Sequence, residues 1–307
     1  MRSSWLGSMQ AALLATLSRP SWWAMALAAF LIRGGIAIIL LPILSVPSAA
    51  AVVTTFSPVV AAIVLGRPSL EGAVVGSSLI AALLAGLAAA GFAGAWLDLA
   101  LVREATEDDD ADIGWRSVHA SASEALAVRL GAHVPTLLAI GYAFLRTVTV
   151  AYEQFTSPSD EGIQIVDRVL ARVPDAVILV LVAWLVGEAV GSLAARRVAA
   201  GMRALPALLA SVRQVAAPRG LATLAATSVV LLTLLTVFMI SVGRAWEHLR
   251  GYLLEGADAV HLWAALVLLV ATWVLGLAIV GAGLAWRATA WTAEMPPPSR
   301  QPALGRP

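Results

Sequence analysis

The sequence lacks cysteine and lysine, and it has few charged residues of any kind. Without cysteine, the chain can form neither disulfides nor thiolate metal sites, and it has no cysteine nucleophile. All twenty basic residues are arginine, which we interpret as the bias of a GC-rich bacterial genome and not as an RNA-binding signal. Charged residues make up 13% of the chain, against roughly 25% in an ordinary soluble domain. The composition therefore argues against a soluble fold and gives no reason to expect a nucleic-acid partner.

Familiar catalytic and metal-binding motifs are also missing. The sequence has no Gly-x-Ser-x-Gly elbow, no Gly-Lys-Ser phosphate loop and no dinucleotide fingerprint. Its four histidines are scattered, and none forms a His-x-x-x-His or His-Glu-x-x-His pair. We therefore predict no catalytic residue, no cofactor and no metal centre, and we expect His133 to lie at an interface and to form a local hydrogen bond.

Long apolar stretches dominate what is present. Each reaches or exceeds the roughly 20 residues that cross a hydrocarbon core about 30 Å thick. Backbone amides in lipid must be satisfied within the chain, so such runs should be helices. The sequence predicts an all-α, polytopic membrane protein with one six-span domain, residues 1–291, and a disordered cytoplasmic tail, residues 292–307. The six predicted spans are Trp22–Leu44, Val74–Val102, His133–Tyr152, Pro174–Val198, Leu221–Val242 and Leu262–Trp286.

The first run has an alternative interpretation as a cleaved signal peptide. Small residues at 47–51 resemble a cleavage site. The preceding run is longer than a typical signal sequence, however, and it carries Arg33 in its middle. We therefore interpret it as the first span.

The distribution of arginine predicts the orientation. With the N-terminus in the cytoplasm, thirteen of the twenty arginines fall in cytoplasmic segments and five in the outer loops. Cytoplasmic loops normally carry the excess of positive charge. We expect a multi-pass protein of the bacterial inner membrane, surrounded by the lipid bilayer, with both termini in the cytoplasm.

Three cytoplasmic segments have the pattern of short amphipathic helices. They are Trp5–Leu17, Ser117–Leu130 and Leu205–Val215, and each precedes two spans. Such helices lie in the membrane interface. The separation of Leu17 from Arg33 equals that of Leu130 from Arg146. The pattern allows three repeats of an interfacial helix followed by a spanning hairpin; the alternative is coincidence.

Ionisable residues inside the predicted spans are the candidate site. Each costs about 2.5–3.5 kcal/mol at the centre of a span. We predict a buried polar cluster in which Glu188 pairs with Arg33 or Arg146, and Asp98 lies nearer the cytoplasmic end of its span. The cluster could serve helix packing alone, or it could form a ligand site. Two arginines with one carboxylate keep a positive charge that suits an anionic ligand.

Glycines accompany two of these charges. Gly34 and Gly35 follow Arg33, and Gly187 and Gly191 flank Glu188 at small-xxx-small spacing. Glycine at such positions lets another helix approach closely. We predict helix packing at both pairs and favour a contact between the first and fourth spans.

An acidic run, Asp108-Asp109-Asp110-Ala111-Asp112, stands in the cytoplasmic loop between the second and third predicted spans. It fits the Asp-Asp-x-x-Asp pattern that holds Mg²⁺ and a diphosphate in prenyl-transferring enzymes, because hard cations take carboxylate oxygens. No second acidic motif occurs, and the calcium-loop pattern fails because Ile113 takes its glycine position. Asp108, Asp109 and Asp112 are therefore only weak metal candidates, and we interpret the run as a solvated charge run.

The chain resembles a loose group of six-span bacterial membrane proteins from GC-rich bacteria. The group includes the membrane domain attached to some glycerophosphoryl diester phosphodiesterases. The resemblance rests on Arg19-Pro20-Ser21-Trp22-Trp23, Arg33-Gly34-Gly35, Trp184, Gly187-Glu188, Gly191 and Arg196-Arg197. It covers most of the chain but is architectural. Because no phosphodiesterase domain is present, the resemblance implies only a membrane-accessory or transport-like role.

The expected function is that of a non-catalytic component of the inner membrane. It would bind, transport or sense a small or lipidic, anionic ligand, with other membrane proteins as candidate partners. One alternative is a Mg²⁺-dependent membrane enzyme that acts on a phosphorylated lipid through Asp108–Asp112. Another alternative is a structural subunit of a larger membrane complex.

Overall fold

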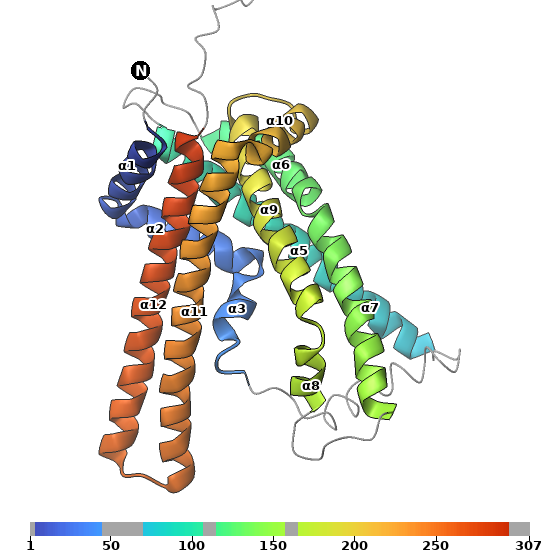
Figure 1. Ribbon diagram of the computed structural model, residues 1–307, viewed down its shortest axis with the longest axis vertical. Helices are drawn as coiled ribbons and strands as arrows, with labels where there is room; N and C mark the ends of the chain where they lie inside the picture. The colour runs from blue at the N-terminus through green and yellow to red at the C-terminus, as the bar shows by residue number, and fades with distance from the viewer. Residues whose placement is uncertain (1–3, 45–69, 107–114, 157–164, 295–307) are drawn as a thin grey trace, which may run out of the picture. The chain divides into compact units, whose positions relative to one another are not determined.

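Every regular element in the part of the chain that the structure describes is a helix (Figure 1). The structure is a computed structural model, and it describes residues 4–44, 70–106, 115–156 and 165–294. The elements are α1 (Trp5–Leu17), α2 (Pro20–Phe30), η1 (Leu31–Gly35), α3 (Ile36–Leu40), α5 (Leu70–Thr106), α6 (Trp115–Ala132), α7 (Val134–Thr156), α8 (Ile165–Ala171), α9 (Pro174–Ala199), α10 (Ala204–Ala216), α11 (Pro218–Glu255) and α12 (Ala259–Ala293).

Five helical stretches within the described residues are long and apolar enough to cross a membrane. They are Pro20–Leu40, Val134–Gln154, Pro174–Ala199, Pro218–Glu255 and Ala259–Ala293. Large apolar side chains on these helices stay exposed, as at Leu138 (71%) and Val260 (75%). A soluble surface rarely gathers so many, whereas lipid-facing helices require them. The predicted class of a helical, multi-pass membrane protein is thereby confirmed.

The second predicted span, Val74–Val102, falls within α5, which is 37 residues long. The apolar helical stretch recognised there among the described residues is Ala89–Leu101. The total of six spans therefore stays a prediction.

The three predicted amphipathic segments are all separate helices. α1 has the predicted bounds, Trp5–Leu17. α6 and α10 begin one or two residues before the predicted segments and end one or two residues after them. A proline begins the helix that follows α1 and the helix that follows α10, where the missing amide hydrogen costs nothing.

The first span is not a continuous helix. Between α2 and α3 the chain forms a π-helical turn, η1, in which Gly34 has φ 103°. Glycine adopts this conformation readily, whereas other residues are strained in it. A Cβ atom on Gly35 would lie 2.4 Å from the ring of Phe30. The two glycines thus shape a break directly beside Arg33.

Arg33 packs against α5 at this break. A Cβ atom on Gly94 would lie 2.7 Å from Cγ of Arg33. The small residue on α5 therefore makes room for the arginine stem.

The predicted tail begins too early. α12 continues to Ala293, and Glu294 forms an ion pair with Arg219. Residues 292–294 are therefore part of the folded chain, because the polar side chains after Trp291 have partners there. Residues 295–307 lie outside the described residues.

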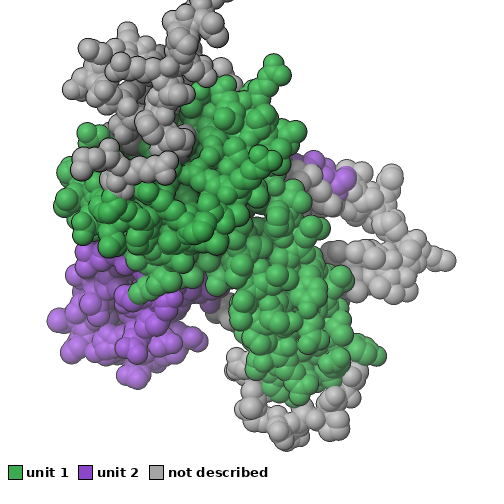
Figure 2. All heavy atoms as spheres, turned by 45° about the horizontal axis from the view of Figure 1, so that its top comes forward, with its two compact units in different colours: residues 1–26, 95–233, 281–307 green, residues 27–94, 234–280 purple. Residues whose placement is uncertain are grey.

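The chain divides into two compact units, shown in different colours in Figure 2. Unit 1 comprises residues 1–26, 95–233 and 281–307, and unit 2 comprises residues 27–94 and 234–280. The prediction of a single domain stays a prediction.

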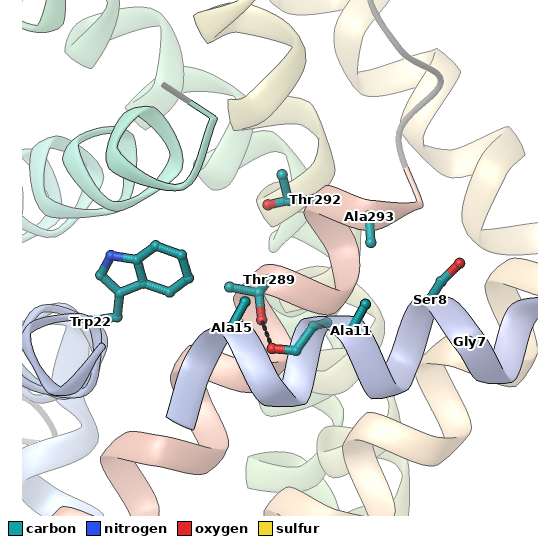
Figure 3. Close-up of a pocket in the computed structure, with 9 residues that line it drawn as sticks. Gly7, Ser8, Ala11, Ala15, Trp22, Thr289, Thr292 and Ala293 are labelled. Atoms are coloured by element: carbon teal, nitrogen blue, oxygen red, sulfur yellow. Dashed lines mark hydrogen bonds between the residues drawn. The ribbon is translucent and has the colours of Figure 1, made fainter. Parts of the chain in front are cut away.

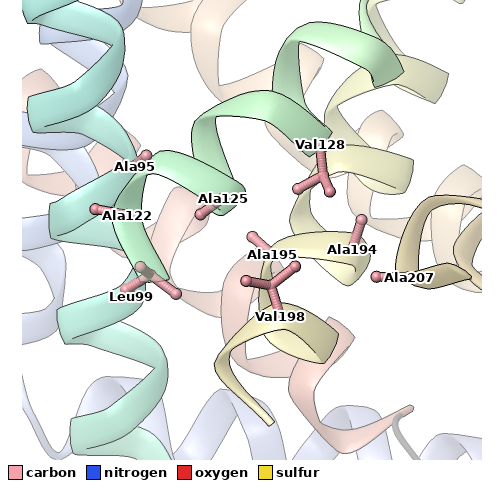
Figure 4. Packing of buried hydrophobic residues seen from close by; sticks show 9 residues of the cluster. All are labelled: Ala95, Leu99, Ala122, Ala125, Val128, Ala194, Ala195, Val198 and Ala207. Carbon is pink, nitrogen blue, oxygen red and sulfur yellow. The ribbon is translucent and has the colours of Figure 1, made fainter. Parts of the chain in front are cut away.

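The main core of unit 1 lies where α5, α6, α9 and α10 meet (Figure 4). Alanine predominates in it, and small side chains let helix backbones approach closely. The buried residues of this core are Ala95, Leu99, Ala122, Ala125, Val128, Ala194, Ala195, Val198 and Ala207.

Unit 2 is packed through aromatic and glycine contacts. Phe238 on α11 meets Trp273 on α12 edge to face, with ring centroids 6.4 Å apart and an interplanar angle of 83°. A Cβ atom on Gly276 would lie 2.4 Å from the Phe238 ring, so only glycine admits that ring. Edge-to-face pairs add to the free energy of simple burial.

Candidate functional site: a charged cluster of α5, α6 and α9

Four ionisable side chains meet in unit 1. Arg129 on α6 forms an ion pair with Asp98 on α5, and its Nη1 atom lies 3.6 Å from Oε2 of Glu188 on α9. Nε2 of His133, between α6 and α7, lies 3.3 Å from Oε1 of Glu188. All four side chains are mostly buried. We call Asp98, Arg129, His133 and Glu188 the charged cluster.

Local structure on α6 places two of these groups together. Arg129 and His133 are four residues apart, which puts them on one face of a helix. The Arg129 carbonyl accepts the His133 backbone N–H at 3.1 Å. It also lies 2.8 Å from Nδ1 of the His133 ring. The ring is thereby fixed with Nε2 directed at α9.

Glycines on α9 allow the close approach. A Cβ atom on Gly187 would lie 3.0 Å from the Ala132 carbonyl oxygen and 3.2 Å from Cδ2 of His133. A Cβ atom on Gly191 would lie 3.4 Å from Cγ of Arg129. The glycine pair therefore faces the end of α6, and Glu188 lies between the two glycines in sequence.

Hydrogen-bond chemistry determines the protonation of the His133–Glu188 pair. A carbonyl oxygen only accepts, so Nδ1 of His133 must carry the hydrogen that it shares with Arg129. In a neutral ring Nε2 would then hold a lone pair facing a carboxylate oxygen. Two acceptors repel each other, so the 3.3 Å contact is favourable when His133 Nε2 or Glu188 carries a proton. With that proton the charged cluster sums to zero.

Arg196 lies beside the charged cluster, and each of its three guanidinium nitrogens donates a hydrogen bond. Its Nε donates to Thr292 Oγ1 at 2.9 Å, its Nη2 to the Ala288 carbonyl at 2.6 Å and its Nη1 to the Ser192 carbonyl at 2.7 Å. It is attracted by the charge of Asp98 and repelled by that of Arg129. Arg196 therefore connects the charged cluster to α12.

A second cation reaches α9 from α12. Nη2 of Arg287 donates to the Leu185 carbonyl at 3.2 Å. Leu185 precedes Glu188 by one helical turn. The carboxylates of the charged cluster are thus set among arginines from both α9 and α12.

The predicted pairing of Glu188 with Arg146 is wrong. Nε of Arg146 lies 3.8 Å from Oδ2 of Asp175, and Tyr142 donates to the same oxygen at 3.2 Å. Thirteen residues along α7 place Arg146 about 20 Å from His133. Arg146 therefore meets the first turn of α9, whereas Glu188 lies near the middle of that helix, about 20 Å further along. Arg33 belongs to unit 2, so its pairing with Glu188 stays a prediction.

Sequence reasoning found Glu188 and Asp98 but missed Arg129 and His133. It assigned Arg129 to a cytoplasmic segment, where a positive charge needs no partner. The spacing of Arg129 and His133 was the available signal, because side chains four apart at the end of a helix point the same way.

The acidic run Asp108–Asp112 lies outside the described residues. Within the described residues, no group of three or more metal-ligating side chains is placed to hold a metal ion. The charged cluster instead joins three helices through buried ionisable side chains.

Comparison of the chain with protein-family models, with curated proteins and with solved structures finds no match. The resemblance to six-span bacterial membrane proteins thus stays a prediction.

Proposed function

We propose that the chain is a six-span membrane protein that binds a small or lipidic, anionic ligand and moves or senses it without catalysing a reaction. We further propose that its charged cluster makes the contact of α6 with α9 depend on a proton. Five candidate spans and the 37-residue α5 support the six spans. At 1.5 Å per residue α5 is about 55 Å long, which exceeds the thickness of a bilayer core.

Helix contacts support the proposed three repeats. Each amphipathic helix packs against the last span of the preceding repeat: α6 on α5, α10 on α9, and α1 on α12. The contact of α1 with α12 includes a hydrogen bond of 2.9 Å between the hydroxyls of Thr16 and Thr289. α1 thus makes with α12 the same kind of contact that α6 makes with α5 and α10 makes with α9.

The observation that carries the function is the contact of His133 with Glu188, at which we place a shared proton. Ionisable side chains in spanning helices are costly, and they commonly mark ligand pathways and proton relays. Loss of this proton changes the summed charge of the charged cluster from zero to one negative charge. Deprotonation therefore weakens the contact of α6 with α9.

Hydrogen–deuterium exchange of the full chain in lipid nanodiscs tests this proposal. We expect faster exchange at the Arg129 end of α6 and around Glu188 at about pH 8 than at about pH 5.5, the range over which histidine titrates. His133→Gln should remove the difference, because a glutamine amide donates to Glu188 at every pH. His248→Gln, in unit 2, is the matched control. An unchanged pH difference in His133→Gln, or no difference in the parent protein, would refute the proton-dependent contact.

A further inference from the structure

A cavity of about 430 Å³ opens between α1, α2 and α12 within unit 1 (Figure 3). Its size lies within the range of small-molecule sites. The wall on α1 consists of small residues one helical turn apart, and the aromatic ring of Trp22 forms the opposite wall. The lining residues are Gly7, Ser8, Ala11, Ala12, Ala15, Trp22, Thr289, Thr292 and Ala293.

Polar contacts hold α1 at its distance from α12. The hydroxyl of Thr289 lies 2.9 Å from that of Thr16 and 3.3 Å from the Ala12 carbonyl. The indole N–H of Trp286 donates to the Met9 carbonyl at 3.3 Å. Because these contacts fix the helix spacing, the small side chains on α1 leave an open volume beside them.

Three arginines contact the lining residues. The guanidinium of Arg19 lies 4.8 Å from the centroid of the Trp22 ring. Arg219 donates to Ser8 Oγ at 3.3 Å, and Arg196 donates to Thr292 Oγ1 at 2.9 Å. Glu294 neutralises one of them through its 2.8 Å ion pair with Arg219. The edge of the cavity is therefore positively charged.

The outer face of α1 indicates where a ligand comes from. Leu6, Leu13, Leu14 and Leu17 are exposed on it. A helix with such a face lies in the lipid interface. A molecule that reaches the cavity from lipid, fills an apolar wall and meets arginines is an amphiphile with an anionic head.

We propose that this cavity binds an anionic phospholipid, with an acyl chain along the alanines of α1 and the phosphate at Arg19. Basic pockets beside spanning helices bind anionic lipid headgroups in this way. The inference rests on the proposed membrane location but not on the charged cluster. A protein that does not bind the lipid at the cavity could therefore still show the proton-dependent contact of α6 with α9, and the two results are distinguishable.

Native mass spectrometry of the purified full chain, titrated with phosphatidylglycerol or phosphatidylcholine, tests the site. We expect one phosphatidylglycerol to bind selectively. Ala15→Leu should abolish this selective binding, because the side chain would fill the cavity from an exposed position. Gln10→Leu places a leucine on α1 away from the cavity and should bind as the parent does.

Charge is tested separately. Arg19→Gln should weaken phosphatidylglycerol binding about fivefold, as expected for one arginine at a lipid surface, and Arg213→Gln should leave it unchanged. Equal binding of both lipids, or parental affinity in Ala15→Leu, would overturn the proposal. Full displacement of the lipid by inorganic phosphate would overturn it too, because a site for phosphate alone needs no acyl chain.

Discussion

Unit 1 and unit 2 are built from the same apolar kinds of residue but are held together differently. In unit 1, α6 and α9 meet through the charged cluster, and Arg196 ties α9 to α12. In unit 2, among the described residues, Phe238 fills a space that Gly276 leaves open. The free energy of unfolding of unit 1 should therefore depend on the charges and protonation of its side chains. That of unit 2 should depend on how closely its side chains fit together.

The largest effect is expected from Arg129→Gln in unit 1. The substitution leaves the carboxylates of Asp98 and Glu188 without their shared cation, which should cost about 3–5 kcal/mol of unfolding free energy. Adding Asp98→Asn should give a total clearly smaller than the sum of the two separate losses. Denaturant unfolding in detergent measures both quantities.

The control for this substitution is Arg213→Gln, because Arg213 is exposed on α10 and should change stability by less than about 0.5 kcal/mol. Strict additivity of Arg129→Gln and Asp98→Asn would show that the two residues do not interact.

In unit 2 the corresponding test adds a methyl group where two helices pack closely. Gly276→Ala should cost about 1–3 kcal/mol, because the new Cβ would lie 2.4 Å from the Phe238 ring. Phe238→Leu should relieve part of this loss in the double variant. Gly251→Ala is the control, since nothing lies within 4 Å of a Cβ atom there. A loss at Gly276 that varies with pH would remove the distinction between the units.

The break in the first span should respond less strongly. Gly34→Ala should cost about 1–2 kcal/mol, because φ 103° forces a side chain into a strained backbone region. Space is not the cause, since nothing lies within 4 Å of a Cβ atom there. Gly86→Ala, also without close neighbours, should be neutral or stabilising. Thermal unfolding distinguishes the two, and equal effects would mean that the break is not strained.

The smallest effect on stability is expected at the exposed turn before α12, where Asp258 and His261 interact. Hydrogen bonds from the His261 backbone and ring lower the pKa of Asp258. A lowered pKa in the folded state adds stability above the unfolded value of about 3.9, and that stability is lost as the pH falls through the folded value. Protection of the His261 amide should therefore fall below about pH 4.

Asp258→Asn should keep the hydrogen bond from the His261 backbone N–H, because asparagine accepts the same amide hydrogen. It should remove the pH dependence, because asparagine does not titrate. Amide exchange at His261 measures it. Persistent acid sensitivity in the variant would assign the effect to another group.

The sequence was sufficient for the helical class, for the three amphipathic helices and for half of the charged cluster. α1 was predicted with its bounds because Pro20 limits the run that follows. Glu188 was found because a carboxylate in an apolar run is costly anywhere along the span. Its partner was not found, because the spacing of Gly187 and Gly191 shows that some helix approaches without showing which one.

The break in the first span was missed for a related reason. Gly34 and Gly35 were interpreted as packing residues, a role that glycine plays in many spanning helices. Only the backbone shows that Gly34 is needed for its positive φ and that Gly35 makes room for Phe30.

Arg196 contacts both the surroundings of the charged cluster and the wall of the cavity, through Thr292. Thermodynamic linkage between two such sites is reciprocal. If a bound lipid changes the proton affinity of the His133–Glu188 pair by some factor, the proton changes the lipid affinity by the same factor. The pH dependence of phosphatidylglycerol affinity therefore measures the coupling free energy in both directions. Because Arg196 lies between the two sites, we expect it to determine the size of this coupling as much as either site does.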